Sequence, residues 1–183
     1  MERPLRKDAA NRRAHLLVAA REVFREEGID APLDRIAIRA GVGRATLYRN
    51  FPGRTEIALA VLIDEIEVLV EAFAQPDGAD AFFDFLTDLQ TLLIRNSALG
   101  DVVRAAPSPE LLAPLREAMV RAATPPLRRS QAEGRVRNDL CPKDVRILLS
   151  MLVAGLHNAT PDEKDALAAR ARQLTFDAVR PRP

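Results

Sequence analysis

Several chemically useful residues are scarce in this sequence. It has no tryptophan, one tyrosine, one cysteine and two histidines among 183 residues. The single Cys141 excludes an internal disulfide and cannot form a thiolate metal cluster by itself. With only His15 and His157 available, a histidine-rich metal centre and a Ser-His-Asp triad are both disfavoured. We therefore expect no metal site and no catalytic residues, and no cofactor is indicated.

Long apolar runs are also missing. No run approaches the roughly 18–20 residues that a transmembrane helix needs. The basic start, MERPLRKDAANRR, has no apolar segment behind it, so no secretory signal is predicted. We expect a cytoplasmic protein without a membrane partner.

Lysine is scarce too, since only three of the 27 basic residues are lysines. The formal net charge of +1 by itself predicts no nucleic-acid partner. The distribution is more informative, because residues 1–56 carry 12 basic and 8 acidic side chains while the rest carry 15 and 18. A basic N-terminal module on a mildly acidic body is compatible with a polyanionic partner, although an ordinary solvated surface explains this charge pattern equally well.

The apolar residues repeat at helical spacing through most of the chain, and no alternating pattern demands a strand. The predicted fold class is all-α, with an N-terminal domain at 1–56 and a C-terminal domain at 57–183. Pro125-Pro126 must kink or interrupt one helix, and a short helix flanked by loops is expected within 96–109. The predicted helices are 9–27, 33–40, 44–50, 54–74, 79–95, 110–133, 143–158 and 162–179.

The segment 33–51, LDRIAIRAGVGRATLYRNF, has the pattern of a helix-turn-helix. Ala37 is small enough for close helix contact, and Gly41 suits the tight turn. Val42 supplies an apolar plug after the turn, while Leu47 and Phe51 anchor the second helix. The opposite face of that helix is then free to enter a DNA major groove.

That outward face carries Arg44, Ala45, Tyr48 and Arg49, with Thr46 and Asn50 beside it. Arginine can bind guanine, asparagine can pair with adenine, and hydroxyl groups can contact phosphate. A helix-turn-helix pattern alone is moderately specific, since helical hairpins in enzymes look similar.

The wider pattern resembles the DNA-binding domain of the tetracycline-repressor (TetR) family of bacterial regulators. The resemblance rests on LLVAAREVFREEGID and LDRIAIRAGVGRATLYRNFPGRTEI and covers roughly the first third of the chain. It implies a recognition helix at 44–50, with Thr46 and Tyr48 at phosphate-contacting positions. Arg49 and Asn50 match positions near base edges or backbone, and Arg54 matches a basic residue that holds phosphate.

The sequence departs from the family pattern at two places. Gly43 stands where many relatives have Ser or Thr, so a side-chain contact to phosphate is absent there. The loop after Gly28 is one residue short and has Pro32 in place of a hydroxyl cap. The basic residues Arg3, Arg6 and Lys7 form either a solubilising tail or an arm in the minor groove, and both alternatives stay open.

The C-terminal part resembles the family in outline only, as a helical body that binds an inducer and dimerises. Two apolar stripes lie in the last two predicted helices. They either face the subunit's own core or build a four-helix dimer interface, and the resemblance favours the interface. The predicted interface residues are Leu148, Leu149, Leu152, Leu156, Leu167, Ala171 and Leu174.

An aromatic cluster near residues 73–85 is the predicted effector pocket, although such residues are most often ordinary core. It favours an apolar or amphipathic ligand, with Arg104 or Arg121 able to hold a single carboxylate. The predicted lining residues are Phe73, Phe82, Phe83, Leu86, Leu89, Gln90, Leu93 and Met119.

Taken with the resemblance, these patterns predict a homodimeric regulator that binds palindromic double-stranded DNA and is released by a small effector, a repressor rather than an activator. Two other classes of protein are alternatives to this prediction. A small helical enzyme is disfavoured because no acid, base or nucleophile constellation is visible. A helical interaction module without DNA affinity would be distinguished by a gel shift.

Overall fold

The computed structural model describes residues 3–106, 108–156 and 159–182, and every regular element in these ranges is helical. The chain divides into two compact units, one of residues 1–62 with 98–107 and the other of residues 63–97 with 108–183. The division falls within α4 (Arg54–Ala72), as does the domain boundary predicted at residue 56. That boundary stays a prediction. Within the described residues no helix is long and apolar enough to span a membrane.

The first unit contains α1 (Arg3–Glu27), α2 (Leu33–Arg39), α3 (Arg44–Asn50) and the start of α4. Most of the short helix α6 (Ser97–Arg104) belongs to it as well. Its core forms because each helix has one apolar stripe, and the side chains at the centre are fully buried. They are Leu16, Val23, Ile36, Leu47, Phe51 and Ile57.

Charged side chains join α1 to α2 at the surface of this unit. Arg39 donates hydrogen bonds to Glu22 (3.3 Å) and Glu26 (2.8 Å), and Arg35 is paired with Glu27 (3.1 Å). The hydrogen bond from Arg39 lowers the pKa of Glu26, and the hydrogen bonds to both glutamates raise the pKa of Arg39. Helix α2 is therefore held to α1 by packing on one side and by ion pairs on another.

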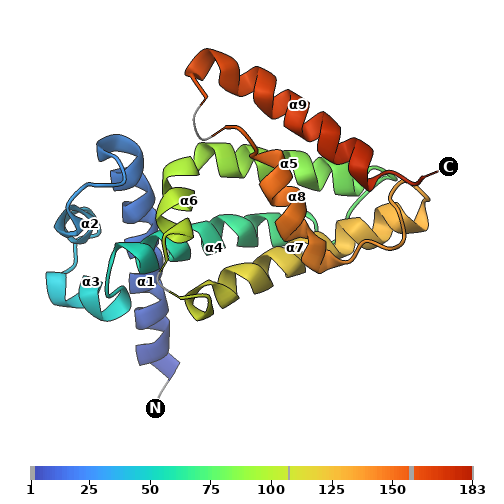
Figure 1. The fold of residues 1–183 in the computed structure, drawn as a ribbon. Helices are drawn as coiled ribbons and strands as arrows, with labels where there is room; N and C mark the ends of the chain where they lie inside the picture. Colours follow the sequence, from blue (N-terminus) through green and yellow to red (C-terminus); the bar gives the residue numbers. More distant parts are fainter. Residues whose placement is uncertain (1–2, 107, 157–158, 183) are drawn as a thin grey trace. The chain divides into compact units, whose positions relative to one another are not determined.

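The second unit is built from the rest of α4 with α5 (Ala81–Arg95), α7 (Ala113–Ala132), α8 (Val145–Leu152) and α9 (Pro161–Val179). Two short 3-10 helices, η1 (Glu110–Leu112) and η2 (Pro142–Asp144), precede α7 and α8. Helix α5 packs against α7, α8 and α9, and its apolar face lies at the centre of the core (Figure 1).

Two buried polar side chains tie α5 to its neighbours. The Gln90 amide donates to the carbonyls of Leu152 (2.8 Å) and Ala168 (2.9 Å), and its oxygen accepts from Arg172 (3.0 Å). The Ser130 hydroxyl accepts a hydrogen bond from the backbone N–H of Phe82 (3.0 Å) in the first turn of α5. Every polar group in these contacts is satisfied, as burial requires.

Helix α8 is shorter than the predicted helix over 143–158. It ends at Leu152, and Gly155 then adopts a φ of +77°. That conformation is favourable for glycine and costly for other residues, so the chain turns inside what the sequence presents as one continuous apolar stripe. His157 and Asn158 lie outside the described residues.

Helix α7 continues through Pro125 and Pro126, so of the two predicted outcomes, a kink or an interruption, the interruption does not occur. Neither proline has a backbone N–H to donate, and the helix lacks two internal hydrogen bonds there. Pro126 is buried, and the Thr124 hydroxyl donates to the carbonyl of Val120 (2.6 Å) one turn earlier. Helix α7 also packs against α5 and α8.

Candidate nucleic-acid interface

The turn between α2 and α3 has defined backbone hydrogen bonds. The N–H of Val42 donates to the carbonyl of Ala37 (3.0 Å), and the N–H of Gly41 donates to the carbonyl of Ile38 (3.1 Å). This pair of bonds is a Schellman motif, in which the residue after the helix takes a left-handed conformation. Gly41 has a φ of +66°, which explains the glycine at this position.

Helix α3 is anchored to the first unit by Leu47 and by Phe51, which follows its last residue. Leu47 is fully buried and Phe51 is nearly so. The guanidinium group of Arg13 on α1 lies 4.5 Å from the centre of the Phe51 ring, which adds a cation–π contact. One face of this seven-residue helix is thus fixed, and the opposite face is exposed.

The exposed face of α3 carries Arg44, Ala45, Tyr48 and Arg49. Helix α3 contains two arginines and no acidic residue, and the Tyr48 side chain is 41% exposed. A short cationic helix of this kind presents donors that suit phosphate and base edges. Contact of these residues with DNA remains a prediction.

Several of the predicted DNA-binding side chains also make contacts within the protein. Arg49 donates to the Thr46 hydroxyl (3.2 Å), and the Asn50 amide donates to the Thr46 carbonyl (2.8 Å). The Nε atom of Arg44 lies 3.0 Å from Oδ1 of Asp34, an ion pair without hydrogen-bond geometry. Each contact uses one guanidinium nitrogen, so both arginines keep further N–H donors for a base or a phosphate.

Arg54 differs most from the role that the family resemblance implies. Its guanidinium group donates to the backbone carbonyls of Ile29, Asp30 (3.3 Å) and Ala31 (3.0 Å) in the loop between α1 and α2. The side chain therefore holds that loop in this structure. The positions of these carbonyls follow from the fold, so the sequence motif alone does not indicate this role.

Sequence comparison adds to this geometry. Residues 16–61, which include α2, α3 and the turn, match the model of the bacterial regulatory proteins of the tetR family. The solved TetR transcriptional regulator SCO0520 from Streptomyces coelicolor is 31% identical, with a TM-score of 0.63, and the match covers 93% of this chain and 99% of that one.

The chain belongs to the TetR family.

A TetR-family structure from Mycobacterium vanbaalenii is 27% identical with a TM-score of 0.60, over 97% of this chain and 100% of that chain. The transcriptional activator FasR of Mycolicibacterium smegmatis is 39% identical over 88 residues. That match spans 41% of this chain and only 40% of FasR. TetR-family proteins are transcription regulators and not enzymes, so the alternative of a small helical enzyme is not supported.

The residues predicted for a dimer interface of this TetR-family chain divide into two groups. Leu152 is fully buried and Leu148 nearly so, both in the subunit's own core, which is the alternative that the sequence analysis left open for these stripes. Leu149, Leu156 and Ala171 are half-buried. Leu167 and Leu174 on α9 are exposed at 39% and 49%, and the neighbouring helix α8 adds the exposed Ile147, which the sequence analysis did not single out.

The residues predicted for an effector pocket are packed closely in the core. Phe82, Leu86, Leu89 and Gln90 are at most 1% exposed, while Phe73 and Leu93 pack against the same core. The aromatic rings contact one another, with centroid distances of 5.5 Å for Phe73–Phe85 and 4.9 Å for Phe83–Phe176. A ligand role for this cluster stays untested.

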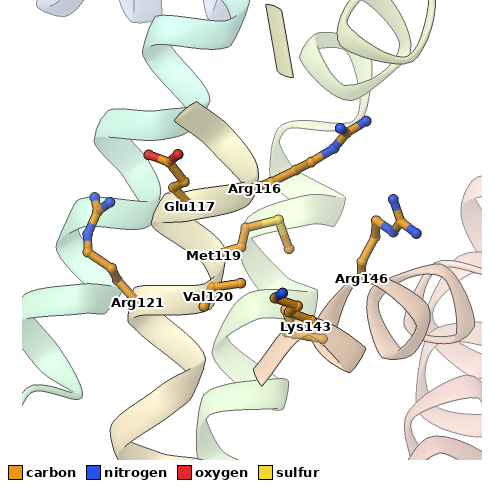
Figure 2. A pocket seen from close by; sticks show the side chains of 8 residues that line it. Arg116, Glu117, Met119, Val120, Arg121, Lys143 and Arg146 are labelled. Atoms are coloured by element: carbon orange, nitrogen blue, oxygen red, sulfur yellow. The ribbon is translucent and has the colours of Figure 1, made fainter. Parts of the chain in front are cut away.

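A pocket of about 630 Å³ lies elsewhere in the second unit, between α7 and the segment that starts α8 (Figure 2). Of the predicted lining residues it includes only Met119, together with Arg121, the predicted alternative partner for a ligand carboxylate. Sequence reasoning missed the other lining residues because most of them are charged side chains that resemble any solvated surface. They are Arg116, Glu117, Val120, Lys143, Val145 and Arg146.

Proposed function

We propose that this TetR-family chain is a transcriptional regulator that binds double-stranded DNA through α3. The observation that carries the proposal is the exposed cationic face of α3, opposite the buried Leu47. The turn at Gly41 fixes α3 against α2, as insertion of a recognition helix into the major groove requires.

Fluorescence anisotropy with the intergenic DNA upstream of the chain's own gene, at several stated salt concentrations, tests this proposal. Arg44→Ala removes an exposed cation and Tyr48→Phe removes one hydroxyl, so both variants should weaken DNA binding while remaining folded. If Arg44 contacts a phosphate, Arg44→Ala should also reduce the slope of log affinity against log salt by about one, whereas Tyr48→Phe, which removes no charge, should leave the slope unchanged.

Arg128→Ala is the matched control, because Arg128 is an exposed arginine on α7, in the other unit. It should bind DNA as the parent does. Parent-like binding by both α3 variants, with unchanged circular dichroism, would contradict the placement of the DNA interface.

We further propose that two copies of the chain associate through α8 and α9 and bind a palindromic site. Ile147, Leu167 and Leu174 support this part, since they expose apolar surface on two helices that pack together. A second copy of the same surface would bury these side chains about a two-fold axis.

The third part of the proposal is that a small apolar or amphipathic effector binds the second unit and releases the DNA. An effector can do so only by binding more tightly to the conformer that does not fit the operator. The pocket beside Met119 supplies space for such a molecule.

The direction of regulation is repression. A promoter–reporter fusion tests it, and deletion of the regulator should raise reporter output. FasR, which resembles this chain over 88 residues, is an activator. A fall in reporter output on deletion would show that this chain, like FasR, is an activator, and would contradict repression.

A further inference from the structure

We propose that the pocket between α7 and the η2–α8 segment binds an amphipathic anion, a carboxylate with an apolar tail. The proposal names the effector class and so rests on the proposed function for its regulatory meaning. It rests on three observations, namely an apolar floor, a cationic rim and a volume that exceeds what a single ion needs.

The floor of the pocket is apolar. Val145 is 2% exposed and Met119 is 8% exposed, and Val120 lies beside them half-buried. Figure 2 shows the Met119 thioether extending from α7 toward the side on which Arg146 lies. Methionine is flexible and polarizable, so it can adapt to tails of different shape.

The rim carries a cluster of cations. Arg116, Lys143 and Arg146 are exposed, and their aliphatic stems continue the apolar wall while their charged ends reach solvent. In Figure 2 the guanidinium groups of Arg116 and Arg146 extend on the same side of α7. Among the described residues, none of these three side chains is within ion-pair distance of a carboxylate.

The acidic groups near the rim lie away from its three cations or have other partners. Glu117 also lines the pocket, and in Figure 2 its side chain extends toward the side of α7 where Arg121 lies, away from Arg146. Arg121 is paired with Glu67. Asp144 accepts a hydrogen bond from the Cys141 backbone (2.8 Å). Glu110 has its pKa lowered by its own backbone N–H and by Ser108, with a smaller contribution from the charge of Arg116.

The volume fits an organic molecule. At about 630 Å³ the pocket lies within the usual range for small-ligand sites. A neutral apolar ligand would leave the cations without partners, and a cationic ligand would be repelled. An anion with an apolar tail can place the tail against the apolar floor and its charge beside the cations of the rim.

Isothermal titration calorimetry with the full chain tests the proposal, using octanoate and 4-phenylbutyrate as carboxylates and 1-octanol as the neutral counterpart. Both carboxylates should bind, and octanoate more tightly than 1-octanol. The double variant Arg116→Gln, Arg146→Gln should weaken octanoate binding about fivefold and leave 1-octanol binding unchanged, because only the charge contacts are lost.

Arg128→Gln, which changes an exposed arginine of α7 outside the pocket, should leave binding of all three compounds unchanged. Met119→Trp should fill the floor and abolish binding, with circular dichroism reporting the fold. Failure of both carboxylates to bind the parent, or fivefold weakening by Arg128→Gln alone, would overturn the proposal. So would equal affinity of the parent and the double variant for octanoate.

DNA binding is measured separately, without any ligand, so the two proposals can fail independently. Octanoate binding by a chain that does not bind its upstream DNA would refute the regulatory function and leave the pocket assignment standing. DNA binding without carboxylate binding would refute the pocket assignment and leave the regulatory function standing.

Discussion

At the scale of single residues, Gly43 and Arg54 bear on the proposed DNA interface in different ways. Gly43 precedes α3 with φ −71° and ψ 149°, ordinary extended backbone that any residue adopts, and no side-chain hydrogen bond caps the helix. A Cβ atom at Gly43 would meet no other atom within 4 Å. Nothing in the backbone therefore requires glycine there.

Gly43→Ser should stabilise the first unit and strengthen DNA binding. A serine at a helix N-cap is a few tenths of a kcal/mol better than glycine, and its hydroxyl can also contact phosphate. Thermal unfolding and anisotropy measure the two effects. A lower melting temperature for Gly43→Ser would show that the site does not accept a side chain.

Arg54→Met should destabilise the first unit by about 1–2 kcal/mol, because the carbonyls of the loop 29–31 lose a charged donor. Denaturant unfolding measures this loss, and the exposed Arg25→Met serves as the control. If Arg54 acted on phosphate alone, stability would be unchanged and only the salt slope of DNA binding would fall.

At the scale of elements, the attachment of α2 to α1 depends on ionised glutamates. The hydrogen bond from Arg39 lowers the pKa of Glu26 in the folded chain. A lowered pKa contributes stability above the ordinary glutamate value near 4.3, and this contribution is lost as the pH falls through the folded value.

Comparing melting temperatures of the parent and Glu26→Gln between pH 7 and pH 3 tests this contribution. The parent should melt higher from pH 7 down to about pH 5, and the difference should shrink as the pH falls below the ordinary glutamate value of about 4.3 and be smallest at pH 3. Because the pair is exposed, high salt should also reduce the difference. A difference that is the same at all pH values would contradict the role of the ion pair.

The helices are also the part of the structure that the sequence predicts best. Leu16, Val23, Ile36 and Leu47 have helical spacing, and burial of an apolar stripe produces that spacing directly. The end of α8 is not predictable in this way, because Val153 and Leu156 continue the apolar stripe past Leu152, where the helix ends, on either side of the turn at Gly155. Local backbone conformation there overrides the apolar pattern.

Sites that combine residues from several helices and loops are harder to predict. The exposed face of α3 follows from its own spacing around Leu47, whereas the loop contacts of Arg54 depend on where the carbonyls of 29–31 lie. The pocket brings Arg116 close to Arg146 only because α7 packs beside η2 and α8. No periodicity within one helix encodes that proximity.

At the scale of the whole molecule, the proposed dimer rests on the exposed side chains of α8 and α9. Leu174→Glu should convert a dimer to a monomer without unfolding it, since Leu174 is 49% exposed and an interface would place a charge in an apolar contact. Sedimentation velocity measures the mass. A folded Leu174→Glu variant that remains a dimer would place the interface elsewhere.

Leu152→Glu is the contrasting variant, because Leu152 is fully buried in the core of its own subunit. It should destabilise the fold by several kcal/mol and not simply separate two copies. Circular dichroism then distinguishes the variants, with native helicity for Leu174→Glu and reduced helicity for Leu152→Glu.

The proline pair of α7 has a mechanical consequence. Two adjacent residues without amide protons make the middle of a helix less stiff, since no backbone hydrogen bond resists bending at those two steps. The lining residues of α7, from Arg116 to Arg121, lie before this compliant point, and Ser130, which is bonded to α5, lies after it. The pocket-lining half of α7 and the half that carries Ser130 are therefore joined by a segment that resists bending less, while Ala118 and Leu127 hold both halves in the same core.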